Sequence, residues 1–464
     1  MKNTIVQKFI ILIGLSLALG IWCSQTGFTS RQALSISIFS ASIFGTLFFW
    51  DFRLSFAFLG SSLLLITKTI DLEHLIKFSS LDIILFLVGM MIIIGLLKES
   101  GFFAWIVSLI LRVRNLTATK FVIAVSLISA LLACAVDEVT SIIFMVAAIL
   151  EICDYFEVNP TPFIITSVLA TNIGSSGTVL GNPIGILIAA KSGLTFEDFI
   201  VKAFPLMLIC LLLAIFIAVL WYRKSIREMD EKIKEVGSNE MLIKLISVPP
   251  DRPLKLSLAI FGVTLLFISL HHRLELLWGL EANTILLIVP LISSACIMIW
   301  KWNKARSYVE KDVEWWTLLF FLLLFAQAGT LKYSGATDVL AQRLSGAVAN
   351  DPSLLTGMVL WISAFGSSIL DNVVLVAAFI PVVQSFKDLG FALQPLWWAL
   401  LFGGCFGGNI TLVGSTANIV ALGILEKERS IKVTFLQWFG IGLSVGIATT
   451  LVIWLALLYL PLLK

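Results

Sequence analysis

The chain contains the same pattern twice, 234 residues apart. LKESG at 97–101 returns as LKYSG at 331–335, and the Asp that follows 39 residues after each Lys is Asp137 in the first copy and Asp371 in the second. A third segment, NIGSSGTVLGNPIG at 172–185, aligns without a gap on CFGGNITLVGSTAN at 405–418. A duplication of this extent predicts a fold built from two related halves.

The environment of these halves follows from composition. Hydrophobic residues make up 59% of the chain and charged residues only 13%, with a mean hydropathy of +1.02. Soluble domains carry about 25% charged residues, so we expect an integral membrane protein whose main partner is the lipid bilayer. The six cysteines form no CxxC pair and no HExxH motif occurs. We expect no nucleic-acid partner and no cofactor beyond a coupling ion, Na⁺ or H⁺.

Apolar segments predict the membrane crossings, each of which needs about 20 residues. Segments 118–153 and 353–386 are too short to cross twice and carry an Asp in the middle, so they predict re-entrant hairpins. Segments 161–192 and 396–427 are long enough to cross once and are interrupted by Gly, Ser, Thr and Asn, so they predict broken helices. The remaining expected spans are 9–25, 33–50, 54–70, 81–98, 203–222, 254–270, 282–300, 313–332 and 434–460.

The predicted fold is thus an all-α polytopic membrane protein with about eleven transmembrane helices and two hairpins in two inverted-topology repeats. Placing the N-terminus in the cytoplasm and the C-terminus outside puts 22 of the 32 Lys and Arg residues on the inner side of the cell (inner or plasma) membrane. An odd number of spans separates the repeat starts, so the hairpins should enter from opposite sides and meet near the midplane. The expected parts are scaffold spans 1–80, a first repeat 81–222, a cytoplasmic linker 223–253, scaffold spans 254–312 and a second repeat 313–464.

Three acids lie inside apolar runs: Asp137, Glu138 and Asp371. A carboxylate at bilayer depth costs roughly 2.5–3.5 kcal/mol on insertion scales, and no Lys or Arg stands within about ten residues of either Asp. A bound Na⁺ or a proton would neutralise the charge. Alternatively, each Asp simply caps the second arm of its hairpin, as Asp residues favour N-cap positions. Glu138 has Asn372 as its counterpart, which makes Glu138 the candidate titrating group.

The broken segments supply further oxygen ligands, and their glycines permit unwound backbone or close helix packing. The predicted ion and substrate site comprises Asp137, Glu138, Thr140, Asn172, Gly174, Ser175, Thr178, Gly181, Asn182, Asp371, Asn372, Asn409, Thr411, Gly414, Ser415, Thr416 and Asn418. Within it, Na⁺ is expected at Asp137, Asn172, Asp371 and Asn409.

These motifs resemble the ion transporter superfamily, in particular its branch of arsenite permeases, Na⁺/H⁺ antiporters and citrate-transporter-like permeases. The divalent anion:Na⁺ symporters are more distant relatives. The resemblance covers nearly the whole chain from about residue 30, and it implies an elevator-type carrier that is often a homodimer. The chain departs from the family pattern where NIGSS replaces NIGG, and its hairpin tips are acidic, whereas those of the dicarboxylate carriers read Ser-Asn-Thr.

Inverted repeats with polar interruptions at matching positions are typical of secondary transporters. We therefore expect secondary active transport of a small anion, an inorganic oxyanion or a carboxylate, coupled to Na⁺ or H⁺. A Na⁺/H⁺ antiporter that uses the midplane acids is the alternative, because those acids have no basic partner nearby in sequence. A passive channel and an intramembrane aspartyl hydrolase are the remoter alternatives, and the chain is not expected to be an enzyme.

Overall fold

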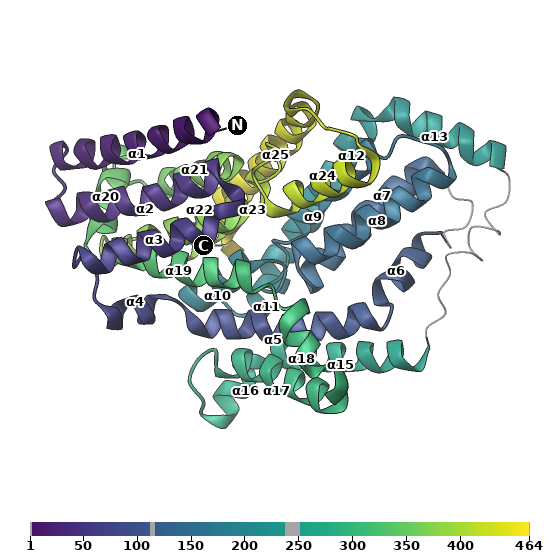
Figure 1. Ribbon diagram of the computed structural model, residues 1–464, viewed down its shortest axis with the longest axis horizontal. Coiled ribbons are helices and arrows are strands. Elements are labelled where there is room, and N and C mark those ends of the chain that lie inside the picture. The colour runs from purple at the N-terminus through teal and green to yellow at the C-terminus, as the bar shows by residue number, and fades with distance from the viewer. Residues whose placement is uncertain (1, 112–116, 237–250, 464) are drawn as a thin grey trace.

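The computed structural model describes residues 2–111, 117–236 and 251–463, and throughout these ranges the regular structure is helical (Figure 1). The N-terminal helices α1 (Lys2–Gln25), α2 (Ser30–Phe48) and α3 (Arg53–Ile66) pack side by side and are followed by the short α4 (Leu72–Phe78). A capping box at Thr29 starts α2.

The first repeat begins with α5. Its helices are α5 (Leu81–Glu99), α6 (Phe102–Leu111), α7 (Ala118–Ala135), α8 (Glu138–Tyr155), α9 (Thr161–Gly174), α10 (Pro183–Ser192), α11 (Phe196–Asp198) and α12 (Phe204–Trp221). The segment between the repeats holds α13 (Arg223–Val236), α15 (Arg252–Ser269), α16 (His271–Trp278), α17 (Thr284–Trp300) and α18 (Ala305–Ser307). The second repeat comprises α19 (Trp315–Tyr333), α20 (Ala336–Ala347), α21 (Pro352–Ile369), α22 (Asn372–Ser385), α23 (Gln394–Gly407), α24 (Thr416–Arg429) and α25 (Phe435–Tyr459).

The helix boundaries repeat with the spacing seen in the sequence. The starts of α5 and α19, of α7 and α21, and of α8 and α22 are each 234 residues apart, and those of α10 and α24 are 233 apart. The packing repeats as well, since α7 lies on α9 as α21 lies on α23, and α8 packs on α24 as α22 packs on α10. The two halves therefore have related structures, and the second hairpin arm of each half packs on the last part of the broken helix of the other half.

The two hairpins approach each other from opposite sides. In Figure 1, α7 and α8 lie to the right of the centre and α21 and α22 to the left, and a side-chain contact between Glu138 and Asn372 joins their tips. Between them α9 and α23 are buried on almost every side: each residue from Pro162 to Gly174 and from Leu396 to Gly407 is buried. These two apolar helices form the centre of the molecule.

The predicted membrane character holds, while the count of eleven spans is not confirmed. In the described ranges eight helices are long and apolar enough to cross a membrane, and nine if the pair 284–300 and 302–312, bent by 103°, is one span. The eight include the hairpin arms α7 and α21. The broken spans are not among them because each is divided into helices of 10 or 14 residues.

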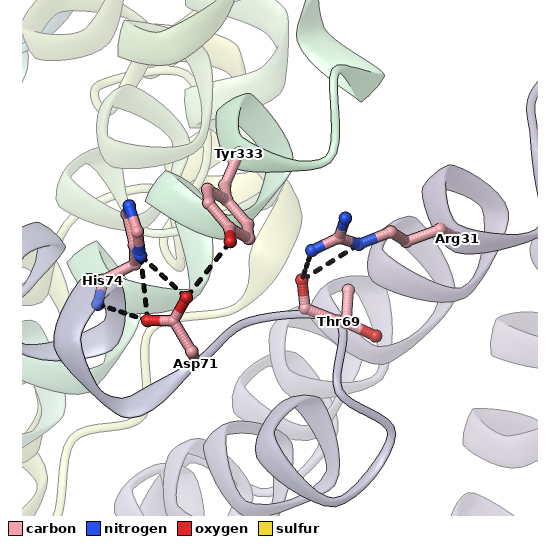
Figure 2. Close-up of polar contacts among 5 residues, drawn as sticks. All are labelled: Arg31, Thr69, Asp71, His74 and Tyr333. Atoms are coloured by element: carbon pink, nitrogen blue, oxygen red, sulfur yellow. Dashed lines mark hydrogen bonds and ion pairs between the residues drawn. The ribbon is translucent and has the colours of Figure 1, made fainter.

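A polar cluster joins the N-terminal helices to the end of α19 (Figure 2). The Tyr333 hydroxyl donates to Asp71, which also accepts from the backbone N–H of His74 and lies 2.8 Å from its ring Nδ1. Arg31 donates through Nε and Nη2 to the carbonyl oxygen of Thr69 and lies over the Tyr333 ring. The hydrogen bonds to His74 and Tyr333 hold the pKa of Asp71 below its usual range.

The linker helix α13 is attached to the first hairpin. Ile226, Met229 and Ile233 are its buried residues, and the carboxylate of Asp230 accepts a 2.6 Å hydrogen bond from the backbone N–H of Ala118, the first residue of α7. Residues 237–250 of the predicted cytoplasmic linker lie outside the described residues.

Candidate functional site

Each hairpin turns at an Asp that caps its second arm. The Oδ1 of Asp137 accepts hydrogen bonds of 2.8 Å from the backbone N–H groups of Val139 and Thr140. The Oδ1 of Asp371 accepts from the backbone N–H of Val373 at 3.1 Å, and its Oδ2 accepts from the Thr416 hydroxyl at 2.7 Å. The capping role considered from sequence is confirmed for both residues, and each keeps carboxylate lone pairs for a further ligand.

The hairpin tips meet through Glu138 and Asn372. Both side chains are buried, with Glu138 only 2% exposed, and the amide nitrogen of Asn372 lies 3.3 and 3.4 Å from the two carboxylate oxygens. An amide is neutral, so this contact leaves the charge of Glu138 without a compensating cation. A buried carboxylate in this position needs a proton or a bound cation to be stable.

The broken helices are joined by a network of amides. The Asn172 Nδ2 donates at 2.8 Å to the side-chain oxygens of Asn409 and Asn418, and its Oδ1 accepts from the Ser415 hydroxyl at 3.0 Å. The Asn418 amide nitrogen donates in turn to the backbone carbonyls of Gly408 and Thr411. We call these four side chains, Asn172, Asn409, Ser415 and Asn418, the amide network. It connects the first repeat to the second, so two of the expected Na⁺ ligands, Asn172 and Asn409, use their side-chain oxygens here as acceptors within the protein.

Paired residues at the breaks attach each unwound segment to its own hairpin. The Thr178 hydroxyl donates to the carbonyl of Cys134, and the Thr411 hydroxyl donates to that of Ser368. Gly174 also packs against its own hairpin, because a Cβ there would lie 2.4 Å from the backbone of Ala130. Close packing thus explains the glycine at this position.

The other two predicted glycines stand inside the breaks. A Cβ at Gly181 would lie 2.2 Å from the carbonyl oxygen of Ser175, and one at Gly414 would lie 2.8 Å from the carbonyl oxygens of Gly408 and Ser367. The backbone of each break therefore folds back on itself, and only glycine fits there.

A cavity of about 450 Å³ lies beside the first hairpin tip. Five predicted site residues line it: Asp137, Glu138, Thr140, Asn182 and Thr416. The remaining predicted residues are not among its lining: Asn172, Gly174, Ser175, Thr178, Gly181, Asp371, Asn372, Asn409, Thr411, Gly414, Ser415 and Asn418. Of these, Asp371 lines a neighbouring cavity of about 80 Å³, and Trp50 borders both cavities.

Other residues that line the larger cavity were not predicted. Arg53 from α3, Lys98 from α5, and Asp312, Glu314 and Thr317 near the start of α19 all line it. The sequence placed no basic residue near the hairpin acids, whereas the structure puts Arg53 and Lys98 on the lining of the same cavity, with no salt bridge within 4 Å to Asp137, Glu138 or Asp371 in the described ranges. The one available signal was that Arg53 and Lys98 flank apolar runs and that Lys98 belongs to the repeated LKESG motif.

The cavity mouth carries further charge. Lys98 lies 3.8 Å from Asp312. Glu314 has part of its side chain exposed, yet the loss of solvation among the surrounding protein raises the pKa of its carboxyl, and the charge of Asp137 adds to this. Nowhere in the described ranges do three His, Cys, Asp or Glu side chains converge on a metal position. At the first hairpin tip, the cavity-lining oxygens suited to a hard cation such as Na⁺ are those of Asp137, Glu138 and Thr140.

Comparison with known proteins agrees with this architecture. An uncharacterized transporter of Mycobacterium tuberculosis is 30% identical over 351 residues, which cover 75% of this chain and 79% of the relative. A second uncharacterized transporter of the same species is 30% identical over 394 residues, 82% of this chain and 85% of the relative. The P protein of Homo sapiens is 26% identical over 80% of this chain, which spans 52% of that longer protein.

The fold has a counterpart among solved structures. The YdaH transporter of Alcanivorax borkumensis, described as having an unusual topology, superposes with a TM-score of 0.51 at 15% sequence identity, over 82% of this chain and 86% of that one. The model of the citrate transporter family matches residues 46–403, which include both hairpins and the first broken helix. The chain therefore belongs to the citrate transporter family of the ion transporter superfamily and is an integral membrane transport protein.

Proposed function

We propose that the protein is a secondary active transporter that moves a small anion together with Na⁺ or H⁺ by an elevator-type alternating-access mechanism. The observation that carries the proposal is the cavity of about 450 Å³, whose lining includes both the carboxylates of a hairpin tip and a buried arginine. A site that holds groups of both signs suits the joint binding of an anion and a cation.

The cation half of the site is assigned to the first hairpin tip. Asp137 and Glu138 both reach the cavity, and Thr140 adds a hydroxyl oxygen. Because Glu138 is buried against a neutral amide, binding of Na⁺ or H⁺ would remove an unfavourable charge. Transport of the anion is then coupled to the cation if the hairpin moves only when Na⁺ or H⁺ is bound to this site.

The anion half is assigned to the space between this tip and α10. Asn182 caps α10, accepting at 2.9 Å from the backbone N–H of Gly185, and Asn182 and Pro183 line the cavity at the positive end of the helix dipole. The cavity thus combines a helix N-terminus with a guanidinium, and both favour an anion.

Alternating access is supported by a second hollow at the other ends of the same helices. The cavity borders the N-terminal ends of α10, α19 and α22, while a hollow of about 910 Å³ borders their C-terminal ends at Lys191, Lys332 and Gln384. The buried helices α9 and α23 lie in the centre of the molecule. Movement of the hairpins and broken helices as one unit would expose the site to each hollow in turn, and the amide network would hold that unit together.

Orientation and assembly belong to the same proposal. The excess of Lys and Arg on one side supports a cytoplasmic N-terminus and an outer C-terminus in the cell membrane. The homodimer expected from the superfamily resemblance completes the proposal.

Proteoliposome flux tests the function. Purified protein is reconstituted, and uptake of labelled citrate, succinate, phosphate or arsenite is followed under an imposed Na⁺ or pH gradient. Uphill accumulation of one of these anions, abolished by collapsing the gradient, is the expected result. Downhill conductance that is insensitive to either gradient would instead identify a channel and refute the proposal.

A Na⁺/H⁺ antiporter is the second candidate, and the closeness of Asp137 and Glu138 at one cavity wall favours it. It predicts Na⁺-driven alkalinisation of acid-loaded vesicles in the absence of any transported anion. The intramembrane aspartyl hydrolase finds no support in the relatives, which are named as transporters.

A further inference from the structure

Arg53 is a buried arginine whose bonding capacity is only partly used. It is the first residue of α3, is 8% exposed, and lines the cavity of about 450 Å³. Its guanidinium lies over the rings of Trp50, at 4.2 Å, and Phe320, at 5.5 Å. These aromatic faces fix the plane of the guanidinium, because a cation is attracted to a ring face.

The donors of Arg53 are not all paired. Nη2 donates at 3.1 Å to the Thr317 hydroxyl, which donates in turn to Glu314 at 3.4 Å, whereas the buried Nε has no hydrogen-bond partner. The acids whose charges act on Arg53 are Asp371, Glu314 and Asp51. Within the described ranges, however, Arg53 forms no ion pair with a carboxylate at 4 Å or less. A buried N–H without an acceptor is costly and rare in folded proteins.

We infer that Arg53 binds the anionic group of the transported substrate, a carboxylate or oxyanion, through its unpaired Nε and the adjacent Nη donors. The inference rests on the proposed function and deepens it. A guanidinium presents parallel N–H groups in a rigid plane that match two oxygens of one carboxylate or tetrahedral oxyanion. The substrate would then supply the acceptor that the protein itself leaves out.

The position of Arg53 adds a consequence for the transport cycle. Arg53 belongs to the N-terminal helices and to neither repeat, whereas Asp137 and Glu138 belong to a hairpin tip. The anion is therefore held between the part proposed to stay fixed and the part proposed to move. Contact with Arg53 exists only in the arrangement seen here, so Arg53 would aid binding from one side of the membrane.

Anion-dependent thermal stabilisation of the full chain in detergent tests this role. Citrate, succinate, phosphate and sulfate are titrated at constant Na⁺ against the wild type, Arg53→Gln and Arg53→Lys, because a ligand of the folded state raises the unfolding temperature by mass action. Arg31→Gln is the matched control, since Arg31 lies in the N-terminal helices outside the cavity with its donors on Thr69 (Figure 2). Flux of the wild type is measured in parallel.

The expected result is that at least one anion stabilises the wild type and Arg31→Gln equally, and that its apparent affinity falls about ten- to hundredfold in Arg53→Gln. Arg53→Lys should be impaired as well, because it keeps the charge and loses the planar pair of donors. A lower unfolding temperature for Arg53→Gln with unchanged anion affinity would make Arg53 purely structural and overturn the inference. Should Arg53→Gln not fold, unchanged affinity in Arg53→Lys overturns it equally.

The same data separate this inference from the proposed function. If no anion stabilises the wild type and none is accumulated under a gradient, the anion transporter itself is refuted. If the wild type accumulates an anion and that anion stabilises both Arg53 variants with unchanged apparent affinity, only the role of Arg53 is lost.

Discussion

Replacing Asn172 by Ala is predicted to loosen the attachment between the two repeats. Asn172 is fully buried, and its amide is the shared partner of Asn409, Asn418 and Ser415. Removing it leaves two carbonyl oxygens and one hydroxyl without that partner. A buried polar group that loses its partner costs about 1–3 kcal/mol, so three of them should lower the free energy of unfolding by about 3 kcal/mol or more.

Thermal unfolding of purified protein, followed by intrinsic tryptophan fluorescence, is the assay. The midpoint of Asn172→Ala should fall by several degrees, while Asn303→Ala, at an exposed position on the surface, should unfold with the wild type. If Asn172→Ala unfolds within one degree of the wild type and the control, the amide network does not hold the repeats together. The proposed rigid moving unit would then lose its physical basis.

Three further predictions concern the hairpin tip, a close contact and the cavity mouth. Glu138→Gln should abolish gradient-driven uptake while leaving the protein folded, measured as flux and as elution from size exclusion; normal coupled uptake would remove Glu138 from the cation site. Gly407→Ala should destabilise the protein by about 1–3 kcal/mol, because its Cβ would lie 2.1 Å from the carbonyl oxygen of Ala364, whereas Gly423→Ala has open space and should be neutral in the same melts. The folded state raises the pKa of the Glu314 carboxyl and so favours its protonated form. The stabilisation of the folded protein by this proton is complete below the ordinary pKa of about 4.3 and is lost as pH rises through the folded-state pKa. The unfolding temperature of the wild type should therefore fall across the window above that value relative to Glu314→Gln, and parallel pH profiles for the two proteins would contradict this sign.

The helical framework was accessible from local patterns. The hairpin breaks fall at Asp137 and Asp371 because an Asp ends the apolar run and can accept the first amide bonds of the next helix. The duplication located the second hairpin and second broken helix from the first. The span count is not confirmed for a local reason too, since the unwound segments divide a crossing into helices that are each too short to span a membrane.

The candidate site was predicted less completely. Polar residues at the breaks were recognised as a group, yet they serve two different purposes. Asn172 and Asn409 bind each other across the repeats, whereas Glu138 and Asn182 face the cavity. Both kinds look alike in sequence, because each is a polar residue in an apolar run. Only the direction in which a side chain points separates a structural hydrogen bond from a ligand.

What the sequence by itself determined is the membrane setting, the two related halves and the places where the helices stop, because hydropathy, glycine and N-cap chemistry act over a few residues. What only the tertiary structure decided is which charges face one another. Arg53 stands 84 residues before Asp137, and the packing of α3 on α2 and α19 helps to place both residues on the lining of one cavity. Electrostatic partnership depends on distance in space, and in a bundle of packed helices that distance is set by long-range contacts.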